Sequence, residues 1–233
     1  MRPNSVPTLQ AHEIEVTKVT HDAAEWVSLF PEDEVPFVLA SILRCGATLT
    51  RRQDGDNENI LSNRLRRSLA RDPEFRNSGI IVDREVEVFD DDSDVEAPIG
   101  RLDFRFLSSA AARDRLWYFA VEAKRLHVSS GSRWDSLVPA YVTGYQGMMC
   151  FIDDRYARGL SSGGMLGYVF DGDIIKARRL VSECVAKNAD KLTIGPVCEL
   201  KTSSIIKEDT RVSETSHALL RGPFVIYHVF LAV

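Results

Sequence analysis

The spacing of apolar residues changes near residue 80, and this change limits the folds that the chain can adopt. Before it, Leu61, Leu65 and Leu69 recur at four-residue steps, close to the period of an α-helix. After it, apolar and polar residues alternate, as in strands with one covered face. We expect, in chain order, two helical pieces within 22–50 interrupted at 31–34, a helix over 57–71, strands over 80–89, 100–107 and 116–126, a helix over 136–152, a strand over 164–170, a helix over 174–187 and a strand over 224–232, with a solvated acidic turn at 90–94.

Three adjacent strands between helical segments predict the fold class. A helical connection after the third strand implies a mixed central sheet flanked by helices, which is an α/β fold. The 233 residues contain no internal repeat and no long Gly/Ser linker, so one compact core is expected. We expect residues 1–50 to form an N-terminal helical extension packed on a domain of residues 51–233.

Net charge, cysteine spacing and the absence of long apolar runs indicate the compartment in which the protein is expected to act. The net charge of -5 is not that of a typical nucleic-acid-binding domain, but seven arginines lie between Arg51 and Arg76. The N-terminus lacks the apolar run of a signal peptide, and no stretch is long enough to cross a bilayer. The four cysteines form no CxxC pair, as expected for free thiols in a reducing compartment. We therefore expect a cytoplasmic protein without membrane contact.

Alternation in two of the strands sets two carboxylates and a lysine on one side of the expected sheet. Asp103 lies on the polar face of the strand over 100–107. Glu122 and Lys124 share the corresponding face of the strand over 116–126, and Asp103 lies beside Glu122 if the two strands pair. The opposite faces are apolar, with Leu102, Phe104 and Phe106 on one strand and Trp117, Phe119, Val121 and Ala123 on the other.

Two carboxylates at this spacing predict a cation site. Brought together, the carboxylates of Asp103 and Glu122 repel each other unless a cation lies between them. Mg²⁺ prefers oxygen ligands and commonly takes one or two carboxylates, with water and phosphate completing its coordination. The alternative is a solvated sheet face on which Lys124 pairs with a carboxylate across strands.

The residues Gly100–Asp103 (GRLD) and Phe119–Lys124 (FAVEAK) resemble the motif of the PD-(D/E)XK nuclease superfamily. The resemblance implies a restriction-endonuclease-like mixed sheet and spans roughly residues 58–170. It also implies that Asp103 and Glu122 bind the metal, and that Lys124 positions or activates the attacking water. Leu102 stands where the family usually has proline.

The same resemblance adds two site residues. Members of the family tend to carry an acidic residue on a helix ahead of the sheet, and Glu58 fits that place as a third metal ligand. Alternatively, Glu58 stabilises the dipole of its own helix from the first turn. Some relatives use a Gln or Tyr after the motif near the metal or DNA, so Gln146 is a further candidate. Its local sequence, Gly144–Gly147, is equally typical of close helix–sheet packing.

The function implied by the resemblance is a Mg²⁺-dependent endonuclease, with Mn²⁺ able to substitute, acting on DNA in prokaryotic restriction, repair or defence. Arg64, Arg67 and Arg71 recur at helical spacing and are candidates for phosphate contacts, although an exposed helical face has the same pattern. A homodimer or a larger defence complex is expected because one such centre cuts one strand. The alternatives are an RNA or single-strand nuclease, and a catalytically silent subunit that binds DNA or a partner.

Overall fold

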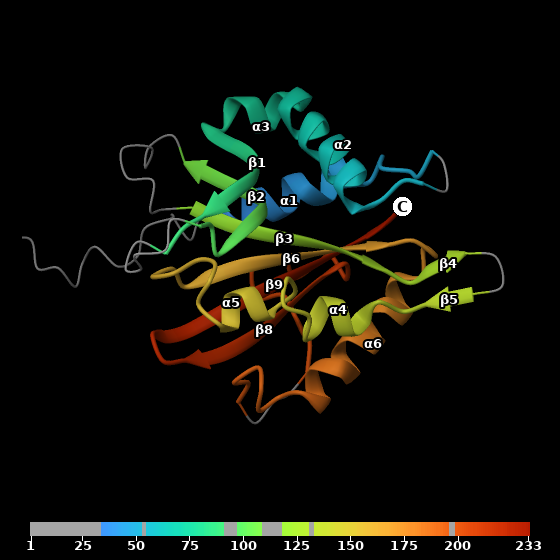
Figure 1. Ribbon diagram of the computed structural model, residues 1–233. Coiled ribbons are helices and arrows are strands. Elements are labelled where there is room, and N and C mark those ends of the chain that lie inside the picture. Colours follow the sequence, from blue (N-terminus) through green and yellow to red (C-terminus); the bar gives the residue numbers. More distant parts are fainter. Residues whose placement is uncertain (1–33, 53–54, 91–96, 109–117, 131–132, 196–198) are drawn as a thin grey trace, which may run out of the picture.

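The computed structural model describes residues 34–52, 55–90, 97–108, 118–130, 133–195 and 199–233. A mixed seven-stranded sheet lies at its centre, with helices on both faces (Figure 1). Its strands are β1 (Ile80–Val88), β2 (Gly100–Ser108), β3 (Tyr118–Leu126), β6 (Ser162–Val169), β7 (Lys201–Thr202), β8 (Val212–Leu219) and β9 (Gly222–Ala232), and a separate two-stranded sheet contains β4 (Val128–Ser130) and β5 (Arg133–Asp135).

The strand order is β1-β2-β3-β6-β9-β8-β7. β3, β6 and β9 are parallel neighbours at the centre, and every other neighbouring pair is antiparallel. This confirms the expected α/β class with a mixed central sheet flanked by helices.

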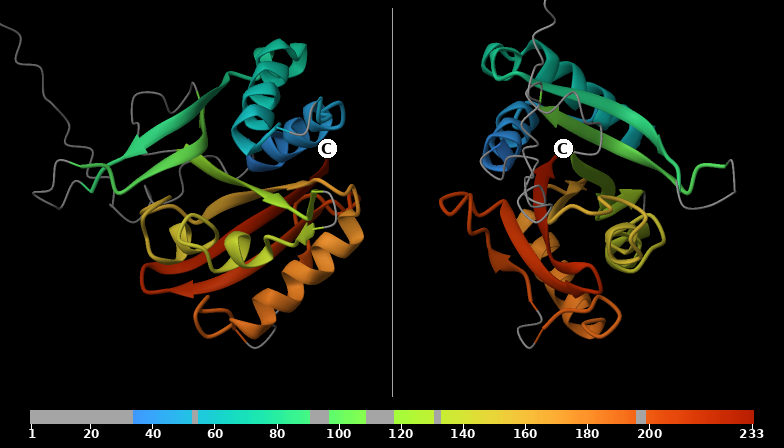
Figure 2. Two further views of the ribbon diagram at one scale, coloured as in Figure 1. Left: turned by 45° about the vertical axis from the view of Figure 1, so that its right-hand side comes forward. Right: turned by 90° about the vertical axis from the view of Figure 1, so that its left-hand side faces the viewer.

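Helices cover both faces of the sheet (Figure 2). α1 (Glu34–Gly46), α2 (Glu58–Arg71) and α3 (Pro73–Asn77) pack on one face, and α4 (Val138–Val142), α5 (Met149–Ile152) and α6 (Ile174–Lys187) pack on the other. Within the described part of the chain, no helix has the length and apolar character needed to cross a membrane. α1 falls within the expected N-terminal extension and shares a core with α2 and the sheet.

α2 forms as its sequence predicts. The side chain of Asn57 accepts a hydrogen bond from the Ile60 N–H, which caps the first turn. Leu61, Leu65 and Leu69 are fully buried against the sheet. The leucine stripe therefore fixes which side of α2 faces the core, and it places Glu58 at the end of that stripe.

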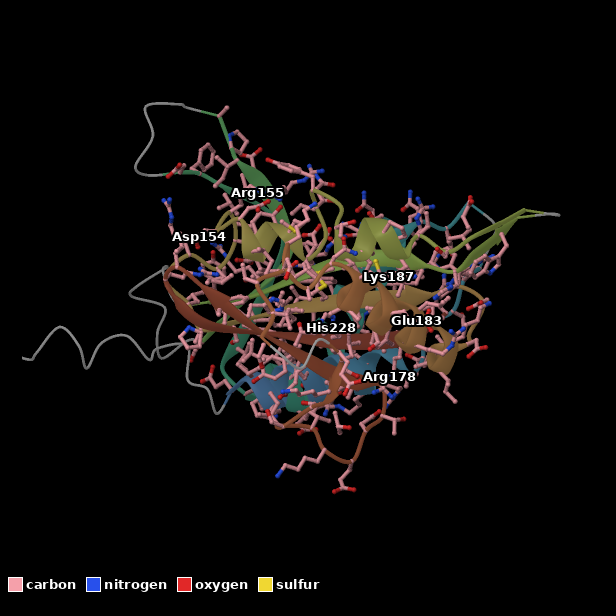
Figure 3. All side chains as sticks on the ribbon, turned by 90° about the horizontal axis from the view of Figure 1, so that it is seen from below. Asp154, Arg155, Arg178, Glu183, Lys187 and His228 are labelled. Atoms are coloured by element: carbon pink, nitrogen blue, oxygen red, sulfur yellow. The ribbon has the colours of Figure 1, made fainter. Side chains whose placement is uncertain are left out.

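Most of the expected elements are confirmed to within two residues where the structure describes them, and β8 is the main omission. Its sequence, VSETSHAL, shows no apolar alternation, since several of its buried positions are polar residues that form hydrogen bonds. One such bond runs from Arg178 Nε on α6 to Ser213 Oγ (3.0 Å), and Arg178 is labelled in Figure 3. The helical piece expected before residue 31, most of the acidic turn at 90–94 and Trp117 lie outside the described residues.

The single helix expected over 136–152 is wrong, because the segment forms the short helices α4 and α5 joined by a tight turn. The chain folds back so closely that a Cβ on Gly147 would lie 2.3 Å from the Tyr141 carbonyl oxygen. The Met148 N–H donates to that same oxygen at 2.9 Å. The two glycines, Gly144 and Gly147, allow a turn that a continuous helix would not contain.

β2 leaves β3 halfway along its length. Their register pairs Phe104 with Val121 and stops there, although the next position would set Asp103 opposite Glu122. Figure 2 shows the β1–β2 hairpin turning away from the remaining strands. The expectation that Leu102 shares a face with Phe104 and Phe106 is wrong in part, since Leu102 packs into the core under α4–α6. The departure of β2 opens a seam in the sheet.

A buried chain of polar side chains ties α4 to the sheet. Tyr141 on α4 hydrogen-bonds to Nδ1 of His228 at 3.0 Å, and Nε2 of His228 contacts the Thr215 hydroxyl at 3.0 Å. Thr215 in turn contacts Nε2 of His217 at 2.7 Å. Burial, with the neighbouring His217 as a smaller cause, lowers the pKa of His228 to about 3 (Figure 3). His228 therefore stays neutral in the folded protein at ordinary pH.

We expect His228 to make stability depend on pH. Below about pH 6.5 the unfolded chain takes up a proton at this ring that the folded protein excludes. The free energy of unfolding therefore decreases as the pH is lowered. Between pH 7 and 5 the loss from His228 is about 2 kcal/mol. Urea unfolding of His228→Gln should show a shallower pH slope than wild type, whereas Thr215→Val should keep the wild-type slope. Parallel curves for His228→Gln and wild type would contradict the low pKa.

Candidate active site

Four of the predicted site residues meet in the seam between β2 and β3. The Lys124 ammonium donates to Oε1 of Glu122 at 2.6 Å and to the Ala123 carbonyl oxygen at 2.9 Å. Oε1 of Glu58 lies 3.9 Å from the same nitrogen, and Oδ2 of Asp103 lies 4.0 Å from it. Three carboxylates from three separate elements thus surround one ammonium group.

Asp103 bridges the seam with its side chain. Its Oδ2 accepts a hydrogen bond from the Ala123 N–H at 2.8 Å, just beyond the last backbone pair of β2 and β3. The carboxylate thereby replaces an acceptor that β2 would have supplied had the two strands stayed paired. This bond fixes one oxygen of Asp103 and turns the carboxylate toward Lys124.

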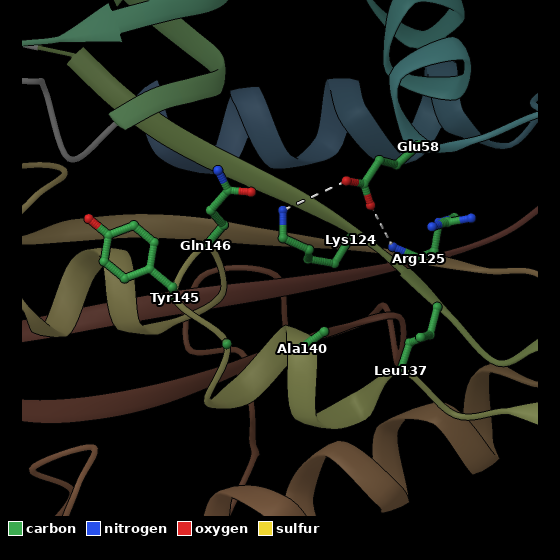
Figure 4. Close-up of a pocket in the computed structure, with 8 residues that line it drawn as sticks. Glu58, Lys124, Arg125, Leu137, Ala140, Tyr145 and Gln146 are labelled. Atoms are coloured by element: carbon green, nitrogen blue, oxygen red, sulfur yellow. Dashed lines mark hydrogen bonds and ion pairs between the residues drawn. The ribbon is translucent and has the colours of Figure 1, made fainter. Parts of the chain in front are cut away.

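Glu58 reaches the seam from α2, in the helical layer formed by α1, α2 and α3. It stands in the first turn of α2, and its Oε2 accepts a hydrogen bond from the Arg125 N–H at 3.2 Å. Figure 4 shows its other oxygen directed at Lys124. The alternative role for Glu58, a first-turn acid serving only its own helix, does not account for these contacts with β3.

Glu122 is the most deeply buried member of the group, with a side chain 3% exposed. Burial and the nearby Asp103 raise its pKa to about 8, although Lys124 acts in the opposite direction. Its Oε2 is buried and has no hydrogen-bond partner among the described residues. A buried carboxylate with an unpartnered oxygen is costly and calls for a cation or a proton.

Lys124 remains charged despite its burial. Loss of water contact alone would lower the pKa of the ammonium, but the charges of Glu122, Asp103 and Glu58 outweigh that effect and raise it. The lysine is therefore a permanent cation at neutral pH, and its charge partly neutralises the three carboxylates.

Glu58 and Lys124 line a pocket of about 420 Å³ between β3 and the turn that joins α4 to α5. Gln146 lies in that turn and is exposed, with its amide on the Lys124 side of the pocket (Figure 4). Tyr145 beside it is 66% exposed, and the Arg155 guanidinium stacks 3.6 Å from the centre of its ring. Gln146 thus lines the pocket, but no hydrogen bond ties it to the carboxylate group in the described structure.

Arg84 on β1 is a site residue that sequence reasoning missed. Its side chain is 5% exposed, and Nε donates to the Asp103 carbonyl oxygen at 3.2 Å. Nη1 donates to the Asn59 carbonyl oxygen at 3.1 Å, so Arg84 joins the first turn of α2 to β2. The sequence carries a signal for it, since Arg84 follows Ile80 and Val82 on the apolar face of β1.

The predicted arginines lie apart from this group. Arg64, Arg67 and Arg71 follow the side of α2 opposite the leucine stripe, so they face away from the seam. Arg64 pairs with the buried carboxylate of Asp56 at 2.5 Å. Arg67 and Arg71 are exposed. The structure does not bring these residues to the carboxylates, and their contact with nucleic acid remains a prediction.

The donor set of the seam suits a hard divalent cation. Among the described residues, Oε2 of Glu122 is buried without a hydrogen-bond partner, and Oδ1 of Asp103 lies 3.8 Å from the Arg84 guanidinium. Carboxylate oxygens are the ligands that Mg²⁺ and Mn²⁺ prefer. As the side chains stand, however, the described residues contain no group of three His, Cys, Asp or Glu side chains arranged to hold a metal ion. Lys124 is the common neighbour of the carboxylates.

Comparison with known proteins finds no matching family model, no matching curated protein and no matching solved structure.

We expect Glu122→Gln to stabilise the protein in buffer that contains EDTA. The folded-state pKa of about 8 exceeds the ordinary carboxyl value, so wild-type stability falls as pH rises from about 4.5 to 8. Glutamine escapes this loss, which is about 4 kcal/mol at pH 7.5 and about 1 kcal/mol at pH 5, so the gain should be larger at the higher pH. Urea unfolding at both pH values measures it. Glu87→Gln, at an exposed position on β1, should change stability by less than about 0.5 kcal/mol. A destabilised Glu122→Gln at pH 7.5 would contradict the raised pKa.

Proposed function

We propose that this protein is a metal-dependent phosphodiesterase that cuts nucleic acid, most directly a DNA endonuclease. The observation that carries the proposal is the meeting of Asp103, Glu122 and Glu58 around Lys124, beside an open pocket that Glu58 and Lys124 line. A structural ion pair needs one carboxylate for one ammonium. Here three carboxylates converge, and one of them keeps an unpartnered buried oxygen.

The residues divide the chemistry of phosphodiester hydrolysis among them. Asp103, Glu122 and Glu58 would hold Mg²⁺ or Mn²⁺, with Asp103 kept in place by Arg84 and the Ala123 N–H. The bound metal would supply charge neutralisation on the phosphate and lower the pKa of a water molecule. Lys124 would donate a hydrogen bond to the attacking water or to the developing negative charge. Gln146, at the rim of the pocket, would orient the substrate or a water molecule.

Fold and motif support a place in the PD-(D/E)XK superfamily. From α2 to β6 the chain runs through a helix, three consecutive sheet strands, a helical segment and a further sheet strand, as expected, although the helical segment is divided into α4 and α5 and the short elements α3, β4 and β5 were not expected. The GRLD and FAVEAK segments supply the carboxylates and the lysine at adjoining positions of β2 and β3. The choice of DNA, the setting in restriction, repair or defence, the cytoplasmic location and the homodimer or larger complex rest on this resemblance.

A second candidate function is a nuclease-like subunit that binds DNA or a partner without cutting. The position of Lys124 favours it, because the ammonium already lies among the carboxylates and satisfies part of their charge. A silent relative could keep such a group as a buried ion cluster. The two functions differ in whether a metal binds and whether cleavage follows.

Cleavage should depend on metal and on the four central residues. We expect the wild type to cut at least one of supercoiled plasmid, linear duplex, single-stranded DNA and RNA with Mg²⁺ or Mn²⁺, and none with EDTA. Asp103→Asn and Lys124→Ala should each lower the rate at least about 100-fold, because each removes a group that handles charge in the reaction. Lys201→Ala, at an exposed position on β7, is the matched control. Full activity of Asp103→Asn or Lys124→Ala would refute the assignment.

Metal binding can be tested without activity. A ligand that binds only the folded protein stabilises it, so saturating Mn²⁺ should raise the melting temperature by about 5 °C. Asp103→Asn keeps an oxygen that can accept the Ala123 N–H but should lose most of this shift. Asp83→Asn, on the neighbouring strand, should keep it. An unchanged melting temperature of wild type with Mn²⁺ would favour the non-cutting subunit.

A further inference from the structure

A basic groove lies on the side of α2 that faces away from the candidate active site. It has a volume of about 410 Å³ and is formed by α2 and the segment that follows α1. Arginines and hydroxyl-bearing residues make up nearly all of its lining: Thr48, Leu49, Thr50, Arg52, Arg64, Arg67, Ser68 and Arg71.

The positive charge of the groove is mostly uncompensated. Arg64 is neutralised by Asp56, whose side chain is fully buried behind it. Within the described residues, no carboxylate lines the groove or pairs with Arg52, Arg67 or Arg71. Arg67 and Arg71 stand four residues apart on one helix, where like charges repel and weaken the helix. In a protein of net charge -5, this concentration of guanidinium groups is best explained by an anion that binds them.

We infer that this groove binds phosphate groups of a nucleic-acid backbone. The planar guanidinium fork matches phosphate oxygens with two parallel hydrogen bonds, and the exposed hydroxyl of Thr50 adds a shorter donor. Among the described residues that line the groove, none has an aromatic ring on which a base could stack. Contacts of this kind hold the strand without reading its sequence. The identity of the ligand rests on the proposed function.

The position of the groove sets a requirement on the substrate. An α-helix rises about 1.5 Å per residue, so the midpoint of Arg64–Arg71 lies roughly 14 Å along α2 from Glu58. The groove is also on the other side of the helix, so a strand must pass over α2 to reach both places. Phosphates several nucleotides from the cut would occupy the groove, and short oligonucleotides would not reach it while occupying the active site.

Binding in EDTA tests the inference without cleavage. We would measure fluorescence anisotropy of a labelled 30-nucleotide single strand and of its duplex with wild type, Arg67→Gln/Arg71→Gln and Arg66→Gln/Arg76→Gln. Glutamine keeps helix propensity, and the second pair removes the same charge from exposed positions outside the groove. We expect the groove variant to bind roughly tenfold more weakly at about 0.1 M salt, with a salt slope shallower by about 1.4 for the single strand and about 1.8 for the duplex. The control should stay within about twofold of wild type, because it removes no direct contact.

Several outcomes would overturn the inference. Equal losses in the two double variants would mean that overall charge, rather than the groove, governs binding. Failure of the wild type to bind either the single strand or the duplex would rule out nucleic acid as the ligand of the groove. Competition by inorganic phosphate at matched ionic strength distinguishes free phosphate from a nucleic-acid backbone as the ligand. If phosphate displaced the labelled strand from wild type more strongly than chloride does, and this difference were absent in Arg67→Gln/Arg71→Gln, the groove would be assigned to free phosphate. A groove-dependent loss of binding in a protein that never cuts would keep the groove and reject the proposed nuclease.

Discussion

The point at which β2 stops pairing with β3 is the constraint on which the candidate site depends. Up to Phe104 and Val121 the two strands share a regular ladder, and beyond it the backbone groups of β3 need other partners. Asp103 supplies one of them with its side chain, and Glu58 supplies another by accepting the Arg125 N–H. Two carboxylates are thus drawn to the seam by backbone hydrogen bonding, and Lys124 and Glu122 on β3 meet them there.

The cluster of Asp103, Glu122, Glu58 and Lys124 is expected to lower the free energy of unfolding. Burying several ionised groups costs more than their attraction returns unless further partners satisfy them. Arg84 on β1 offsets part of this free-energy cost, because its side chain donates hydrogen bonds to carbonyl oxygens of both β2 and α2. Within the described part of the chain, Glu122 is only partly satisfied, because one of its oxygens is buried without a hydrogen-bond partner. An unsatisfied buried carboxylate of this kind is consistent with the proposed function, because local rules of polar satisfaction are most often broken at functional sites.

Sequence alone predicts the parts of this protein that depend on local pattern. The leucine stripe gave α2, alternation gave β1–β3, and the shared face of Glu122 and Lys124 followed from the two-residue period. β8 escaped because its buried positions are polar, and the break between α4 and α5 escaped because it depends on how closely Gly147 approaches Tyr141. The closeness of Lys124 to Glu58 was expected only by analogy, since it requires β2 to leave the sheet.

The hydrogen bond from Ala123 to Asp103 also affects how this protein would change over evolutionary time. If the proposed chemistry were not under selection, an acceptor at position 103 would still be needed to satisfy the Ala123 N–H. Among the described residues, no backbone N–H depends on Glu122 in this way, and burial of its charge opposes folding. Substitutions would therefore be tolerated first at position 122 and last at position 103. A retained aspartate at 103 would be weak support for the proposed function, and a retained glutamate at 122 stronger support.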